Sequence, residues 1–205
     1  MDDTERPATA TSSSDKRVGK NESGEWSRYA QLVAFGVSSG VFFAAGLLIT
    51  EAAGEFAVDV DLKPFIIPYL LIAINRFGLA TVSIGLGAAL GEGALDVVEG
   101  YELDDPVGFL GYLLGFNLFG WYLHEVAGDP TRVRSLAIAA TLGGFVQAVV
   151  EATAFLMFES GVGPLGAMFS VLGNTVTHGV LLGAIPLAIL VQMVPSLRNR
   201  IAATI

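Results

Sequence analysis

Long uncharged apolar segments separated by short polar ones fill the chain from about Tyr29 onward. A helix rises about 1.5 Å per residue and a bilayer core is about 30 Å thick, so a run of about 20 apolar residues crosses a membrane once. The pattern predicts an all-α, polytopic membrane protein whose six transmembrane helices form a compact bundle. The expected helices cover about 29–50, 65–74, 79–98, 107–124, 136–158 and 165–194.

The number of crossings depends on the segment from Phe65 to Val98, in which Arg76 is the only charge up to Leu90. This segment is too long for one crossing and short for two full ones. Polar and flexible residues from Asn75 to Gly78 favour a tight turn about a third of the way along it. We therefore predict a short second helix before the turn and a full third helix after it.

The basic residues favour six crossings, because cytoplasmic loops collect Lys and Arg. With six crossings both termini are cytoplasmic, and of all the basic residues only Lys63 lies outside. A single tilted helix in place of the second and third would move the Arg132/Arg134 loop and the Arg198/Arg200 tail outside. The residues expected inside are Arg6, Lys16, Arg17, Lys20, Arg28, Arg76, Arg132, Arg134, Arg198 and Arg200.

Composition divides the chain into residues 1–28, expected to be a disordered acidic cytoplasmic tail, and residues 29–200, the membrane domain. The net charge of −9 with scarce lysine resembles the acidic surfaces of proteins from extreme halophiles. Without cysteine the chain has no disulfides, thiolate metal sites or cysteine nucleophiles. It also has no basic patch for nucleic acid, and we expect neither a metal nor a cofactor.

Polar residues of the last three helices are expected at matching depths in the outward half of the bundle. Glu151 and Asn174 lie about 10–14 Å from the outer ends of their helices, and Gln147 and His178 lie one turn deeper. The two helices run in opposite directions, so Glu151 comes level with Asn174, and Gln147 with His178. Asn117 on the fourth helix lies at a similar depth, about 15 Å in.

Such a group of polar side chains in an apolar wall is typical of a small-molecule site. The alternative is that these side chains only satisfy one another between packed helices. For Glu151 we favour a function, because an ionisable group inside a bilayer costs at least about 2.5 kcal/mol. Aromatic residues such as Phe155 and Phe169, with Thr177, are expected to line the site. The candidate substrate-binding residues are Asn117, Gln147, Glu151, Phe155, Asn174 and His178.

Two other patterns receive plainer interpretations. Glu92, Asp96 and Glu99 recur at i, i+4 and i+7 on the outer end of the third helix, where we expect a solvated acidic end rather than a cation site. The residues from Gly36 to Gly40 match G-x-S-x-G, but a nucleophile elbow needs a strand-to-helix turn, which a transmembrane helix does not provide. We expect no enzyme; an intramembrane serine hydrolase that pairs Ser38 or Ser39 with His178 is a minor alternative.

Several stretches resemble the substrate-binding S component of energy-coupling factor (ECF) transporters. One is IPYLLIAINRFG (Ile67 to Gly78), a short Pro-containing second helix and turn that run into a glycine-rich third helix ending in GAALGEGALD. Another is FSVLGNTVTHGVLLGAIPLAIL (Phe169 to Leu190), which is similar to the last helix of that family. Ala30 and Ala34 match the alanine-x-x-x-alanine pattern through which its first helix meets the transmembrane coupling subunit.

The resemblance implies a multi-pass protein of the cell membrane that captures a nutrient or vitamin from outside. It implies a site built from the loop after the first helix and the outer halves of the last three helices, where Asn117, Glu151, Asn174 and His178 fall. A coupling subunit and ABC-type ATPases would supply ATP hydrolysis, since this chain has no phosphate loop. Glu151 suits a neutral or cationic ligand. The alternative class is a non-transporting membrane scaffold or assembly protein.

Overall fold

The computed structural model describes residues 15–51, 60, 62–100, 105–158 and 163–204. The chain divides into two units, residues 1–31 and residues 32–205. The described part of the first unit is the beginning of α1, and the second unit holds the helical bundle. The elements are α1 (Asp15–Glu51), α2 (Ile66–Ala73), α3 (Leu79–Glu99), α4 (Asp105–Trp121), the π-helix η1 (Tyr122–Val126), α5 (Val133–Phe158), α6 (Pro164–Asn174), the π-helix η2 (Thr175–Ala184), α7 (Ile185–Met193) and α8 (Pro195–Ala202).

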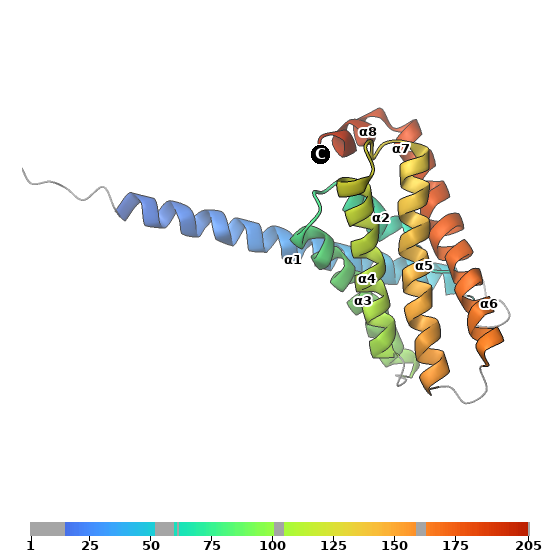
Figure 1. The fold of residues 1–205 in the computed structure, drawn as a ribbon. Coiled ribbons are helices and arrows are strands. Elements are labelled where there is room, and N and C mark those ends of the chain that lie inside the picture. The colour runs from blue at the N-terminus through green and yellow to red at the C-terminus, as the bar shows by residue number, and fades with distance from the viewer. Residues whose placement is uncertain (1–14, 52–59, 61, 101–104, 159–162, 205) are drawn as a thin grey trace, which may run out of the picture. The chain divides into compact units, whose positions relative to one another are not determined.

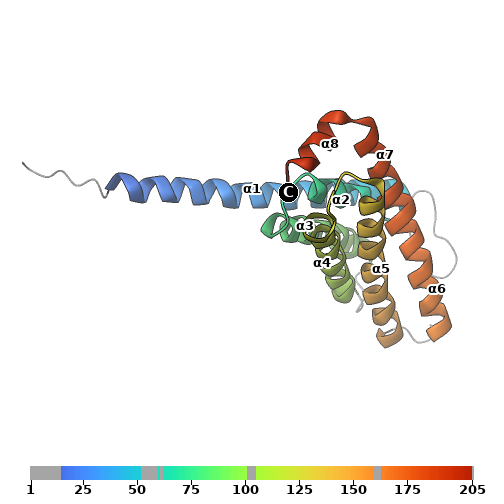
Figure 2. The same cartoon turned by 45° about the horizontal axis from the view of Figure 1, so that its top comes forward.

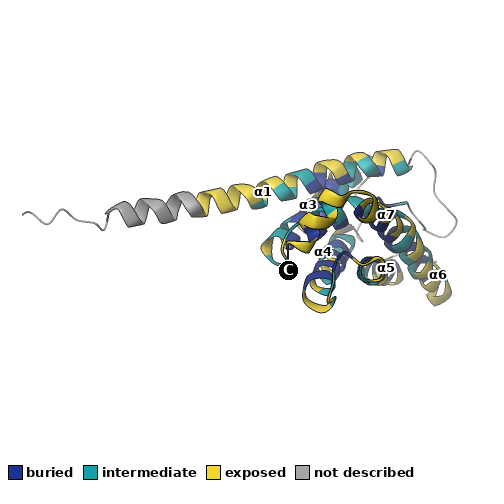
Figure 3. Ribbon diagram, turned by 90° about the horizontal axis from the view of Figure 1, so that it is seen from above, coloured by how far each residue is buried: buried dark blue, intermediate teal, exposed yellow. Residues whose placement is uncertain are grey.

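Four stretches of helix within the described residues are long and apolar enough to cross a membrane: Glu25–Thr50, Leu79–Val98, Val133–Phe158 and Pro164–Met193. Large apolar side chains such as Leu86, Phe145 and Leu172 are exposed on these helices. Figure 3 shows exposed positions along the helices of the bundle. A surface of this kind fits lipid tails rather than water. The chain is therefore an all-helical membrane protein, as its sequence predicts.

The helices of the second unit pack in a simple order around α5. One side of α5 contacts α4, and the other side contacts α6 and η2, while α3 packs against α4 (Figures 1 and 2). The short α2 contacts α3, α4, η2 and α7, so protein surrounds it on several sides.

Aromatic side chains fill the space around the start of α2. The Phe65 ring is fully buried, and its centroid lies 5.5 Å from that of Tyr69, 5.0 Å from that of Phe116 and 5.0 Å from that of His178. Such ring pairs each contribute about 0.5–1.5 kcal/mol beyond their buried area. Phe65 therefore anchors the segment that leads into α2.

The turn after α2 depends on one glycine. The Asn75 side-chain amide donates to the Leu71 carbonyl, 2.7 Å away, at the end of the helix. Gly78 then adopts φ +132°, a conformation that residues with a Cβ rarely adopt, and α3 begins at Leu79. The bounds of α2 and α3 differ from the predicted 65–74 and 79–98 by a residue at each changed end.

The last predicted helix, 165–194, is divided into α6, η2 and α7. Pro186, in the first turn of α7, has no N–H and its ring clashes with the carbonyl four residues earlier, that of Leu182. The wider π-helical turns of η2 come directly before this point and accommodate the mismatch. A π-helix of this length is not predicted by the sequence pattern, which indicates only a kink at Pro186.

Helix α1 begins at Asp15, well before the predicted start at Tyr29. Of the segment expected to be a disordered tail, residues 15–28 belong to this helix, and residues 1–14 lie outside the described residues. Once the apolar part of a helix has formed, each added residue gains a backbone hydrogen bond without a new nucleation cost. Extension into the polar segment follows from this cooperativity.

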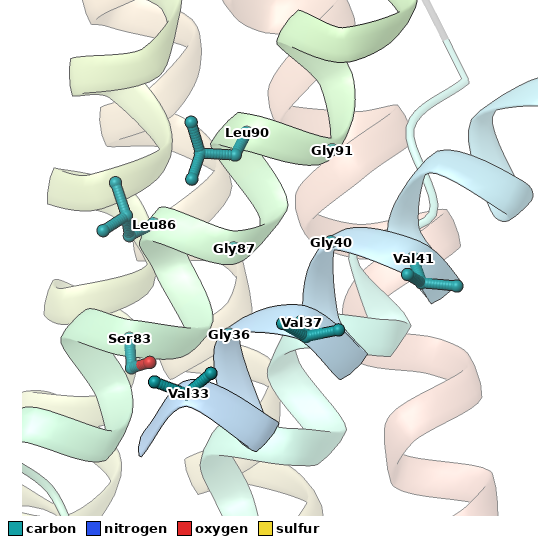
Figure 4. A pocket seen from close by; sticks show the side chains of 10 residues that line it. All are labelled: Val33, Gly36, Val37, Gly40, Val41, Ser83, Leu86, Gly87, Leu90 and Gly91. Atoms are coloured by element: carbon teal, nitrogen blue, oxygen red, sulfur yellow. The ribbon is translucent and has the colours of Figure 1, made fainter. Parts of the chain in front are cut away.

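Glycines allow α1 and α3 to touch backbone to backbone. A Cβ at Gly87 would collide with the backbone of Gly36, and one at Gly91 with the backbone of Gly40. The Ser83 hydroxyl donates to the Leu32 carbonyl, 2.5 Å away, across the same contact. Beside the contact lies an apolar groove of about 450 Å³ (Figure 4). Its lining residues are Val33, Gly36, Val37, Gly40, Val41, Ser83, Leu86, Gly87, Leu90 and Gly91.

Replacing Gly87 by Ala is expected to lower the free energy of unfolding by about 1–3 kcal/mol, because a backbone carbonyl cannot move aside as a side chain can. Thermal unfolding in detergent measures the loss. Gly108→Ala on α4 is the matched control, since a Cβ there meets nothing within 4 Å. Equal midpoints for the two variants would contradict the close α1–α3 contact.

Contacts of His124 in η1 connect the C-terminal segment to the end of α2. The His124 ring nitrogens lie 3.2 Å from the Ile72 carbonyl and 3.2 Å from the Thr204 hydroxyl oxygen.

In the turn before α5, the Thr131 hydroxyl and backbone N–H both donate to Asp129, which lowers the pKa of that carboxyl. The turn thus favours an ionised Asp129 at neutral pH.

Candidate functional site

Glu151 accepts hydrogen bonds from three separate parts of the second unit. The Lys63 ammonium lies 2.7 Å from Oε1, and the Gln147 side-chain amide donates to Oε2 over 2.9 Å. The Asn174 amide reaches the same Oε2 over 3.4 Å and also donates to the Ser170 hydroxyl, 3.3 Å away. These donors come from α5 itself, from α6 and from the segment before α2, so the carboxylate connects elements distant in sequence.

Lys63 joins this carboxylate to a second one. Its Nζ lies 3.0 Å from Glu92 Oε1 on α3 and 5.6 Å from the centroid of the Tyr112 ring on α4. The side chains of Lys63, Glu92 and Glu151 are 9%, 14% and 11% exposed, so water reaches them little. We refer to Lys63, Glu92, Tyr112, Gln147, Glu151, Ser170, Asn174 and His178 as the Lys63 cluster.

His178 extends the cluster into η2. Its Nδ1 lies 3.4 Å from Gln147 Oε1, and its ring packs against Phe65. Because the Gln147 amide nitrogen donates to Glu151, its oxygen is left to accept from His178, which fixes Nδ1 as the protonated nitrogen of this contact. The hydrogen bonds therefore run from His178 through Gln147 to Glu151, and Lys63 links Glu151 to Glu92.

The charges of the cluster do not cancel. One ammonium faces two carboxylates, in a bundle where each charge loses most of its hydration. The ion pairs compensate for the lost hydration only if their contacts are short and further donors are present. Gln147 and Asn174 supply such donors to Glu151. With both carboxylates ionised, Lys63, Glu92 and Glu151 carry a net negative charge, which would suit a further cation.

The Tyr112 hydroxyl is an unused polar group beside these charges. The residue is 1% exposed, and within the described residues its hydroxyl makes no hydrogen bond. It lies beside the Glu92 carboxylate. A ligand with a polar group could bind this hydroxyl.

The structure brings together four of the six predicted substrate-binding residues: Gln147, Glu151, Asn174 and His178. Phe155 is buried one turn farther along α5. Asn117 is half-buried, and in the described part of the chain its side chain hydrogen-bonds only its own helix, at the Leu113 carbonyl.

Two residues expected at the site, one on α4 and one on α6, do not contact the Lys63 cluster in the described part of the chain. Depth along a helix does not fix which way a side chain turns, and α4 directs Tyr112 and Phe116 inward instead of Asn117. Phe169 is 54% exposed, and its neighbour Ser170 is the buried residue that contacts Asn174. Thr177 is half-buried and donates to the Gly173 carbonyl in the preceding turn.

Two charged members of the cluster were not predicted. Glu92 is paired with Lys63 and is not part of a solvated acidic end, while Asp96 is half-buried and the Glu99 side chain lies outside the described residues. Lys63 is predicted to lie on the outer side of the membrane, and the structure shows in addition that it is buried, directly before the Phe65 anchor. The sequence contains one indication of a special role for Lys63, because it is the one basic residue expected on the outer side.

The remaining candidates lie apart from the cluster. Ala30 and Ala34 are exposed on α1, as residues that meet another helix would be. Ser39 is buried and its hydroxyl has no hydrogen-bond partner among the described residues, while His178 is engaged with Gln147. Within the same residues no three His, Asp or Glu side chains gather as a metal site.

The arrangement is chemically suited to binding a small polar or cationic molecule. It offers two carboxylates, an aromatic face, a free hydroxyl and amide groups from five elements and one irregular segment. Comparison with known proteins found no matching family model, no matching curated protein and no matching solved structure.

Proposed function

We propose that the chain is the substrate-binding subunit of an uptake transporter in the cell membrane, which captures a small neutral or cationic nutrient from outside. The Lys63 cluster carries this proposal. Ionisable residues within a membrane bundle are costly, and their usual reason is a substrate or ion pathway. Here three charged side chains from separate elements converge with directional amide donors.

The proposed topology has six crossings and both termini in the cytoplasm. Helix α4 and η1 together run from Asp105 to Val126, about 30 Å at the rise of a helix, which is enough for one crossing. Helix α2 covers only about 12 Å, but a short helix and a turn are tolerated at membrane depth where protein surrounds them. In this topology Lys63 follows the outer loop, so the cluster is reached from outside.

The resemblance to S components of ECF transporters supplies the partners in this proposal. A transmembrane coupling subunit would meet α1 at Ala30 and Ala34, and ABC-type ATPases would hydrolyse ATP. The exposed side chains of Val33, Val37 and Val41 on the same helix support a contact with another apolar helix. The small residues at 30 and 34 permit the close approach that helix pairs in membranes use.

Affinity purification of the tagged protein from its native membranes in mild detergent tests the proposal. We expect mass spectrometry to identify an ABC-type ATPase and a multi-helix membrane protein among the recovered chains. Recovery of the protein alone, or with unrelated membrane proteins, would favour the scaffold or assembly class, in which the polar cluster is structural.

Replacing Ala34 by Trp is expected to reduce recovery of the coupling partner by about tenfold, because a large side chain prevents close helix approach. The measure is the ratio of partner to tagged protein in the purified material. Leu156→Trp on the exposed face of α5 is the matched control, since Leu156 is 48% exposed and lies on another helix. Equal loss in both variants would remove Ala34 from the contact.

A further inference from the structure

The position of the Lys63 ammonium defines a subsite for a positive charge. Glu92 and Glu151 approach Nζ from α3 and α5, at 3.0 and 2.7 Å, and the Tyr112 ring lies within the range of a cation–π interaction, at 5.6 Å. These three groups stand on three helices of the bundle. They form a cage around the ammonium, and none of the three belongs to the segment that carries Lys63.

Lys63, in contrast, reaches the cage from an irregular segment. Residues 62–64 belong to no helix, and the Lys63 backbone is fixed mainly by the Phe65 anchor that follows. The lysine side chain has a flexible four-carbon stem and can withdraw its ammonium without moving that anchor. The cage residues therefore lie on helices, whereas the Lys63 ammonium can leave the cage by a change of its side-chain conformation.

The cage offers more negative charge and more hydrogen-bonding groups than the Lys63 ammonium needs. Two carboxylates face one ammonium, and the buried Tyr112 hydroxyl beside Glu92 makes no hydrogen bond among the described residues. Two other titratable groups are close in the fold: His178 on η2 contacts Gln147, and Asp96 follows Glu92 by one turn of α3. No described basic residue apart from Lys63 is paired with either carboxylate.

We propose that the protein binds organic cations, and that the Lys63 ammonium occupies the ligand's position in its absence. The ammonium group of the ligand would replace Lys63 Nζ between Glu92, Glu151 and the Tyr112 ring. This rests on the proposed function, since it names the ligand class of the same site. A polar group next to the ligand's ammonium would be bound by the Tyr112 hydroxyl. The displaced Lys63 ammonium would withdraw from the space between Glu92 and Glu151.

An anionic ligand is the main competing class, because Lys63 could bind a carboxylate or phosphate directly. Such a ligand would meet Glu92 and Glu151 within a few ångströms of its own charge, in surroundings that screen charges weakly. It would also have to separate Lys63 from both of its partners. The two classes predict opposite effects of removing the lysine charge.

The test measures binding of n-butylammonium chloride to purified wild-type protein and to Lys63→Met, by thermal stabilisation in detergent at constant ionic strength. Removing the internal competitor is expected to tighten n-butylammonium binding by about tenfold or more. n-Butanol, which has the same chain without the charge, and sodium chloride are expected to give no stabilisation. Equal or weaker binding to Lys63→Met than to wild type would overturn the proposal.

A second variant covers the case in which Lys63→Met does not fold. Lys63→Met/Glu92→Gln leaves one carboxylate, Glu151, with its donors Gln147 and Asn174, and is expected to bind n-butylammonium. Adding Glu151→Gln is expected to abolish this binding, and retained binding would place the cation elsewhere. Partner recovery from native membranes is independent of these measurements, so a failed cation test with recovered ATPases overturns only the ligand class.

Discussion

Replacing Lys63 by Met is expected to lower the free energy of unfolding by about 3–5 kcal/mol. The change leaves the Glu92 and Glu151 carboxylates buried near each other without the ammonium that now lies 3.0 and 2.7 Å from them. Removing one partner of a buried ion pair is far more costly than removing both, since the remaining charge has lost its hydration without compensation. Thermal unfolding in detergent measures the effect.

Two further variants separate the loss of the charge from the loss of the side chain. Arg134→Met removes an exposed positive charge and is expected to change the unfolding midpoint little. Lys63→Met/Glu92→Gln/Glu151→Gln removes all three charges together and is expected to regain most of the stability that the single variant loses. A Lys63→Met variant as stable as wild type would contradict the buried ion pairs.

Replacing Glu151 by Gln is expected to weaken binding of ammonium compounds by about tenfold or more. The substitution keeps the size of the side chain and an oxygen that Gln147 and Asn174 can still donate to. It removes one of the two negative charges of the cage, and Lys63 then neutralises the other through Glu92. The loss therefore reports charge recognition rather than a disrupted fold.

The measurement is the stabilisation of both proteins by a set of primary and quaternary ammonium compounds, each titrated in a thermal-unfolding assay. Glu125→Gln is the control, because Glu125 is an exposed carboxylate in η1, outside the Lys63 cluster. Unchanged affinity in Glu151→Gln would remove Glu151 from the site and leave it as a packing residue.

The all-helical membrane class and most helix bounds could be predicted because apolar length and turn residues are local properties. Asn75 and Gly78, for example, end one helix and start the next through their own hydrogen bonds and backbone angles. The division of the last helix at η2 could not be predicted, since a π-helix is the structural response to Pro186 and its surroundings. The early start of α1 depends on cooperative extension of a neighbouring apolar helix.

The site was predicted in part for a similar reason. Glu151, Gln147, Asn174 and His178 follow from helix depth alone, because neighbouring antiparallel helices bring equal depths together. Lys63 depends on the path of an irregular segment. Whether Asn117 or Tyr112 faces the interior depends on the rotation of α4 about its axis. Only the packing of the bundle determines that rotation.

Native mass spectrometry can show directly whether the Lys63 cluster binds a small molecule. The protein is purified gently from its own membranes as wild type and as Glu151→Gln, and small molecules released on unfolding are identified. Wild type is expected to carry an organic cation in a one-to-one ratio, and Glu151→Gln is expected to carry little or none. The same small-molecule content in both proteins, or none in wild type after incubation with a metabolite extract, would contradict this expectation.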